Sequence, residues 1–180
     1  VSGANVTGQN FTSAAVSSGS ALINGGFESG ATGWTQAIGY TGTQCFQFPT
    51  NATLRNTITG GPKAGAYCGW LGGYDGANDI LYQQVAIPSG IPKAELRFYV
   101  RLKTEETTTT TAYDYLRVQI RDTANAVKAT LLTLTNLSTP KDSYVEYAYD
   151  LTAYAGQTMR VHFNATNDDH STGGGENKGG

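Results

Sequence analysis

The sequence predicts an all-β fold, an antiparallel β-sandwich, with a jelly roll as its favoured form. In the middle of the chain, apolar residues alternate with polar ones, which is the pattern of strands with one buried face. Glycine, proline, asparagine and aspartate separate these short segments, and nowhere do apolar residues keep a helical period over three turns. The composition agrees, because 23 glycines and 11 tyrosines accompany only 14% of charged residues.

The clearest strand is predicted at residues 94–103, where alternate residues are apolar and should face the core. Residues 115–121 and 159–165 repeat the pattern. The expected inward side chains are Leu96, Phe98, Val100 and Leu102, then Leu116, Val118 and Ile120, then Met159, Val161 and Phe163. Weaker strands are expected at residues 21–24, 44–48, 66–71, 80–87, 127–135 and 144–151.

The chain divides into three predicted parts. Residues 1–19 should form an N-terminal strand and linker arm, since residues 12–20 are small and polar. Residues 20–168 should form the sandwich, and residues 169–180 a flexible glycine-rich tail with nothing apolar to bury. The chain begins at Val1 without a signal sequence, so we expect a mature product or a fragment.

Charge and hydropathy exclude two classes of partner. A net charge of -2 without a basic cluster predicts no nucleic-acid binding. No apolar run approaches the roughly 18 residues that a membrane-spanning helix needs, so we expect no membrane span.

Catalytic groups are scarce, and we expect no enzyme activity. The only imidazoles belong to His162, predicted to be solvated on the outer face of its strand, and His170, in the polar tail. Glu105 and Glu106 are neighbours in an extended segment, so their side chains should point apart instead of sharing a substrate bond.

The two cysteines, Cys45 and Cys68, suit one disulfide and match no paired metal-binding motif. Such a bond would stabilise the fold by roughly 3 kcal/mol. Two unlinked thiols are the alternative.

Oxygen-rich turns suggest a structural calcium ion. Glu28 is the only charged residue before Arg55 and lies in a glycine-flanked turn, while a second turn contains Asp75, Asn78 and Asp79. Calcium binds carboxylate, amide and backbone oxygens, which such turns expose. The competing interpretation is that these residues bond their own backbone as ordinary turn formers.

Aromatic residues suggest a carbohydrate ligand. Tyr99 and Tyr115 fall on the polar sides of their strands, and Trp70, Tyr74 and Tyr82 flank a glycine-rich turn. Exposed rings beside arginine, glutamine and asparagine suit sugar binding. Tyrosine is also simply a common strand residue, so a structural role remains open.

Four segments carry a resemblance to a known family: residues 69–75, 83–88, 104–114 and 149–157. They resemble a domain appended to the C-terminus of secreted bacterial peptidases and other exported proteins, and the chain from Asn24 onward looks like the galactose-binding-like jelly rolls of carbohydrate-binding modules. Residues 1–12 resemble the last strand of an Ig-like repeat. The resemblance implies a secreted, extracellular protein in which Glu28 matches a position that contributes to structural calcium. An oxidising location would favour the Cys45–Cys68 bond.

The sequence departs from this family at its end, where the last apolar strand is missing. We expect the segment at residues 4–12, with Val6 and Phe11, to lie as a strand against a sheet edge of its own domain or of a neighbouring copy. The leading hypothesis is a non-catalytic accessory or adhesive domain that binds glycan or a cell surface. The alternative is a subunit of an extracellular filament, assembled by exchange of the N-terminal strand.

Overall fold

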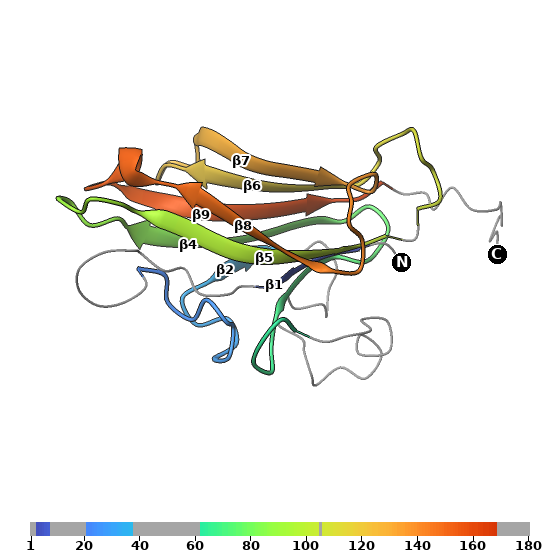
Figure 1. Cartoon of the computed structure of the whole chain (residues 1–180), viewed down its shortest axis with the longest axis horizontal. Helices are drawn as coiled ribbons and strands as arrows, with labels where there is room; N and C mark the ends of the chain where they lie inside the picture. Colours follow the sequence, from blue (N-terminus) through green and yellow to red (C-terminus); the bar gives the residue numbers. More distant parts are fainter. Residues whose placement is uncertain (1–2, 8–20, 38–61, 105, 169–180) are drawn as a thin grey trace.

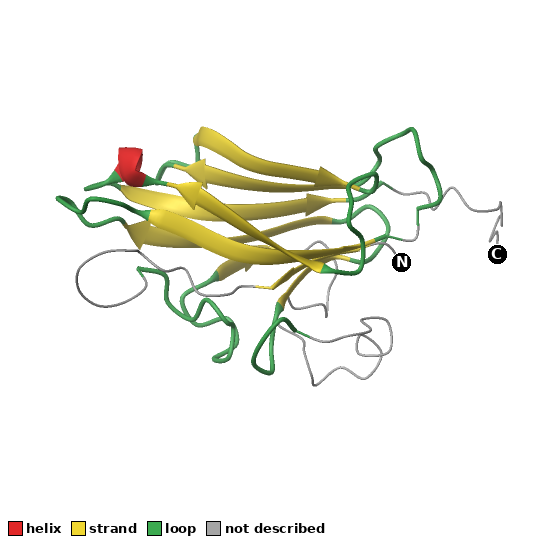
Figure 2. Cartoon of the chain, viewed as in Figure 1, coloured by secondary structure: helices red, strands yellow, loops and turns green. Residues whose placement is uncertain are grey.

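The computed structural model describes residues 3–7, 21–37, 62–104 and 106–168. Two antiparallel sheets pack face to face, one with strand order β3-β1-β5-β8 and one with order β2-β4-β9-β6-β7 (Figure 1). The described part has no helix beyond one short 3-10 turn, Thr152–Tyr154 (Figure 2), and therefore none long and apolar enough to cross a membrane. The strands are β1 Gly3–Thr7, β2 Thr35–Ala37, β3 Gly69–Gly72, β4 Asn78–Ala86, β5 Glu95–Lys103, β6 Tyr115–Arg121, β7 Val127–Thr135, β8 Tyr144–Asp150 and β9 Thr158–Thr166.

The core lies between the sheets, and the predicted alternation places it correctly. All ten side chains expected to face inward from β5, β6 and β9 are buried. Phe98 of β5 meets Phe163 of β9 edge to face, with ring centroids 5.4 Å apart, so aromatic packing joins the two sheets at their centre. The predicted all-β antiparallel sandwich is confirmed, while its jelly-roll connectivity stays a prediction.

Seven of the nine strands overlap the predicted ones in the middle and at the end of the chain, from β3 to β9. β2 was not expected, and the predicted strand at 44–48 lies outside the described residues. The predicted strand at 21–24 is wrong, because the backbone there is bent. Gln83 of β4 takes the place of a neighbouring strand: its side-chain amide accepts from the Ile23 N–H at 2.7 Å and donates to the Ile23 carbonyl at 2.8 Å.

The N-terminal strand occupies the interior of the four-stranded sheet. β1 pairs with β3 on one side, from Gly3–Gly72 to Val6–Gly69, and with β5 on the other, from Gly3–Lys103 to Thr7–Tyr99. The segment predicted to form a strand does so over residues 3–7, and within its own chain. As predicted, it lies along the edge that β5 would otherwise expose; it also carries β3 on its other side, which was not expected and places it inside the sheet.

Candidate functional site

The outer face of the five-stranded sheet carries five half-exposed side chains that we call the arginine face: Tyr82, Tyr115, Arg117, Arg121 and Arg160. They come from the central strands β4, β9 and β6. The register places Tyr82 opposite His162, which is opposite Gln119, and places Arg160 opposite Arg121. Because directly opposed residues of antiparallel strands share a face, all of these side chains project away from the core.

The arginines are supported by the tyrosine rings. The Arg117 guanidinium lies 4.4 Å from the centroid of the Tyr115 ring, and that of Arg160 lies 4.9 Å from the centroid of Tyr82. Arg121 donates to the side-chain oxygen of Gln119 at 3.0 and 2.6 Å. Cation–π contacts and hydrogen bonds to neutral acceptors fix the guanidinium groups without cancelling their charge.

His162 lies beneath this layer and was misjudged from the sequence. Its strand position is on the outer face, as expected, but only 2% of the residue is exposed, so the prediction of a solvated imidazole is wrong. The Tyr82 ring stacks on it with centroids 6.0 Å apart. Burial, and then the nearby charges of Arg121 and Arg160, lower the pKa of His162 to about 4. The imidazole is therefore neutral at neutral pH.

This shift predicts a specific pH dependence of stability. Because the pKa of His162 falls from 6.5 to about 4 on folding, the unfolded chain binds a proton between these pH values that the folded chain does not. The free energy of unfolding should therefore drop as the pH falls from 7 to 4, by about 3 kcal/mol from this residue. Urea unfolding of the parent and of His162→Gln at both pH values isolates the contribution; equal pH dependence in the two proteins would contradict it.

The other predicted aromatic ligands lie elsewhere. Tyr99 is on the outer face of the opposite sheet, with the Lys63 ammonium 5.2 Å from its ring centroid. Trp70 is buried, contrary to the expectation of an exposed ring, and its indole N–H donates to the Gly72 carbonyl at 3.0 Å. Tyr74 donates its hydroxyl hydrogen to Asp79. The five predicted ring residues therefore do not form one groove. Tyr82 and Tyr115 share the outer face of the five-stranded sheet, whereas the register places Trp70 in line with Arg101, on the side of the other sheet that Tyr99 faces.

The predicted calcium ligands organise two turns. The Glu28 carboxylate accepts from the backbone N–H groups of Ala66 and Tyr67, at 2.9 and 3.1 Å from Oε1. Asp79 is buried and accepts from the Gly72 N–H at 2.8 Å. Asp75 is exposed, and the side-chain oxygen of Asn78 accepts from Asn164 at 2.9 Å. Within the described residues, Glu28, Asp75 and Asp79 do not join a common cluster of acidic groups.

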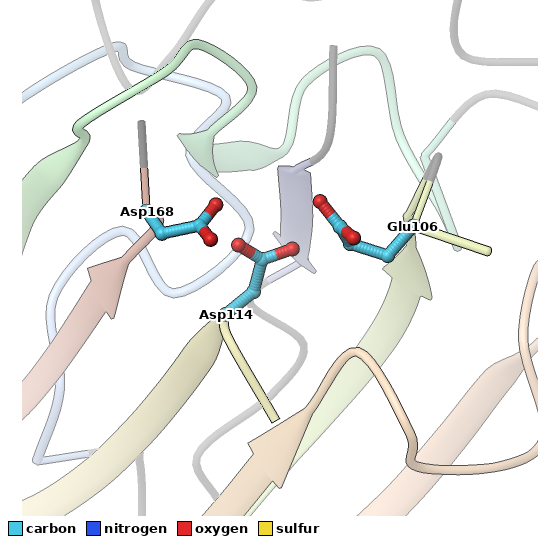
Figure 3. Close-up of side chains that lie close together, drawn as sticks. All are labelled: Glu106, Asp114 and Asp168. Atoms are coloured by element: carbon cyan, nitrogen blue, oxygen red, sulfur yellow. The ribbon is translucent and has the colours of Figure 1, made fainter. Parts of the chain in front are cut away.

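A different group of carboxylates does come together, which we call the acidic triad: Glu106, Asp114 and Asp168. One oxygen of each lies within 4.8 Å of the oxygens of the other two. Glu106 and Asp114 are buried, and Asp168 is half-buried. Figure 3 shows the three carboxyl groups gathered around a common space, with Asp114 in the middle.

The triad was not predicted from the sequence, where Glu106 was compared only with its neighbour Glu105. The positions of the three acidic residues relative to the strands could have indicated the triad. Glu106 follows the end of β5, Asp114 precedes β6, and Asp168 follows the end of β9. Antiparallel pairing of β6 with β9 brings the start of one to the end of the other, so carboxylates at these termini meet.

Chemically, the triad offers a site for a divalent cation. Calcium–oxygen distances of about 2.3–2.6 Å allow two ligands of one ion to be up to roughly 5 Å apart, which the triad satisfies. Three like charges this close repel one another, and a bound cation would compensate them.

The predicted disulfide and the second arm residue cannot be placed. Cys68 is buried beside β3, whereas Cys45 and Phe11 lie outside the described residues, as does His170. The Cys45–Cys68 bond therefore stays a prediction.

In comparisons with known proteins, no protein-family model and no curated protein matches the chain.

Proposed function

We propose that the chain is a non-catalytic, secreted accessory domain that binds carbohydrate, on a glycan or a cell surface, through the arginine face. The observation that supports this most is the gathering of planar polar side chains there. Half-exposed arginine and tyrosine lie beside exposed Gln84 and half-exposed Asn164 on one sheet face. Such groups donate hydrogen bonds to sugar hydroxyls and accept hydrogen bonds from them.

The buried position of His162 supports a binding role over a catalytic one. Its imidazole lies under Tyr82, Arg121 and Arg160, out of reach of a substrate on the surface. A general base must lie within hydrogen-bond distance of the proton it removes.

Retention on immobilised polysaccharides tests the proposed function. We expect the full chain to be retained, and Tyr82→Ala and Tyr115→Ala each to weaken binding about tenfold, because each removes a ring and the support of one guanidinium. Tyr99→Ala is the matched control on the opposite sheet and should bind like the parent. Equal loss from all three variants, or no retention at all, would contradict the assignment of this face.

We also propose that a structural calcium ion belongs to this domain and is held by the acidic triad. The acidic triad replaces the turns around Glu28 and Asp79 as the proposed calcium site, because the carboxylates of Glu28 and Asp79 accept hydrogen bonds from backbone N–H groups. The convergence of three carboxylates at one end of the sandwich supports the new position.

A filament subunit is the second candidate, and the position of β1 favours it. An N-terminal strand with neighbours on both sides fills a slot that the same segment of another copy could fill with identical backbone pairs. Light scattering separates the two candidates: a monomer at all concentrations supports the accessory domain, whereas polymers that grow with concentration support the filament subunit.

A further inference from the structure

We propose that the arginine face selects anionic polysaccharides, whose carboxylate or sulfate groups are bound by the guanidinium groups of Arg117, Arg121 and Arg160. This inference rests on the proposed function and specifies its ligand class.

These three arginines have no carboxylate partner in the part of the chain that the structure describes. Among the described residues, none of them forms an ion pair. The side chain of Arg160 makes no hydrogen bond to a described residue, and its Nε is buried without an acceptor. Arg117 has a single long contact, 3.4 Å to Thr166 Oγ1. Guanidinium N–H groups thus remain for an incoming acceptor.

The outer face of the opposite sheet differs, because its basic side chains are paired with carboxylates. There, Arg97 pairs with Glu95 and with Glu146, and Lys93 pairs with Glu95. The outward positions of β4, β9 and β6 contain no aspartate or glutamate at all. The nearest acidic residue along β6, Asp122, pairs with Lys128 at 2.9 Å. Although the chain has a net charge of -2, the described residues of this face include three arginines and no acidic side chain that pairs with them.

The tyrosine rings of the arginine face are already covered by guanidinium groups. The guanidinium groups of Arg117 and Arg160 lie over Tyr115 and Tyr82, and Tyr82 also stacks on His162. A ligand approaching this surface therefore meets fixed guanidinium groups rather than bare aromatic faces. Planar guanidinium groups held in place bind carboxylate and sulfate by paired hydrogen bonds with little loss of side-chain entropy. A neutral polysaccharide would leave these charges without a partner.

The test measures binding of the full chain to four probes: polygalacturonate for carboxylates, dextran sulfate for sulfates, dextran as the neutral chain, and a single-stranded DNA oligonucleotide. We expect at least one acidic polysaccharide to bind roughly tenfold or more tightly than dextran, with an affinity that falls as salt is raised. Arg160→Gln and Arg117→Gln should each lose about tenfold in affinity for that polymer. Arg97→Gln makes the same change in net charge on the opposite sheet and should bind like the parent, and thermal unfolding of each variant verifies its fold.

The outcomes separate this inference from the proposed function. Preference for polygalacturonate assigns the site to carboxylates, and preference for dextran sulfate assigns it to sulfates. Equal binding to dextran, unchanged in the arginine variants, would overturn the inference and leave carbohydrate binding intact. Tighter binding to the oligonucleotide than to either acidic polymer would overturn it in favour of a nucleic-acid ligand. No binding to any polysaccharide would overturn both the inference and the proposed function.

Discussion

Deleting residues 1–19 should destabilise the protein more than any other change considered, because it removes a strand from the interior of a sheet. β3 is hydrogen-bonded only to β1 within the four-stranded sheet, so the deletion separates β3 and leaves one edge of β5 unpaired. β1 pairs through four residues with β3 and through five with β5, and at about 1 kcal/mol for each hydrogen bond the loss is on the order of 5 kcal/mol or more. Many domains have no more stability than that in total.

Urea unfolding and light scattering of the truncated chain measure this effect. A synthetic peptide of residues 1–12 added in trans should restore stability, since it can form the same pairs, and a scrambled peptide should not. A truncated chain that stays soluble, monomeric and as stable as the parent would show that β1 contributes nothing to the sheet.

Removing calcium should lower the melting temperature if the acidic triad holds the ion. An ion bound only by the folded chain stabilises it by about 2.7 kcal/mol at a concentration 100 times its dissociation constant, and by about 4.1 kcal/mol at 1,000 times. For a domain of this size, the shift would be roughly 5 to 15 °C. We expect a chelator to produce this decrease and added calcium to reverse it, measured by differential scanning calorimetry.

Two variants locate the ion. Asp114→Asn removes the central charge of the triad and should abolish the response to calcium. Glu28→Gln alters the position that the family resemblance implies, yet should keep the full response, because the Glu28 carboxylate accepts backbone N–H groups instead. Loss of the calcium response in Glu28→Gln but not in Asp114→Asn would assign the calcium site to Glu28. No response of the parent to chelator would show that neither Glu28 nor the acidic triad holds calcium.

The fold was largely predictable because alternation along a half-buried strand directly reports its inward face. Leu96, Phe98 and Val100 show this most plainly. The strand prediction at residues 21–24 failed because a side chain, and not a neighbouring strand, forms the hydrogen bonds to the backbone there. Gln83 satisfies the bent backbone at Ile23, and no local pattern at residues 21–24 indicates that a glutamine far along the chain will do so.

The candidate site was only partly predictable, because strand pairing creates it. The sequence placed Tyr115 and His162 on outer faces, but it did not show that Arg160 and Arg121 would lie opposite each other, above a buried imidazole. It also grouped acidic residues by closeness along the chain. Glu106 and Asp114 lie at the two ends of the connection between β5 and β6, Asp168 follows β9 far along the chain, and the three meet because these strand ends lie at one end of the sandwich.

Mapping the bound surface shows whether carbohydrate binds to the outer face of the five-stranded sheet. In a titration of the isotope-labelled chain with oligosaccharides from the best-binding polymer, followed by two-dimensional NMR, we expect the largest shifts on β4, β9 and β6, including the amides of Tyr82, Arg117 and Arg160. Shifts concentrated on β5 and β8 around Tyr99, or no shifts at saturating ligand, would contradict binding to this face.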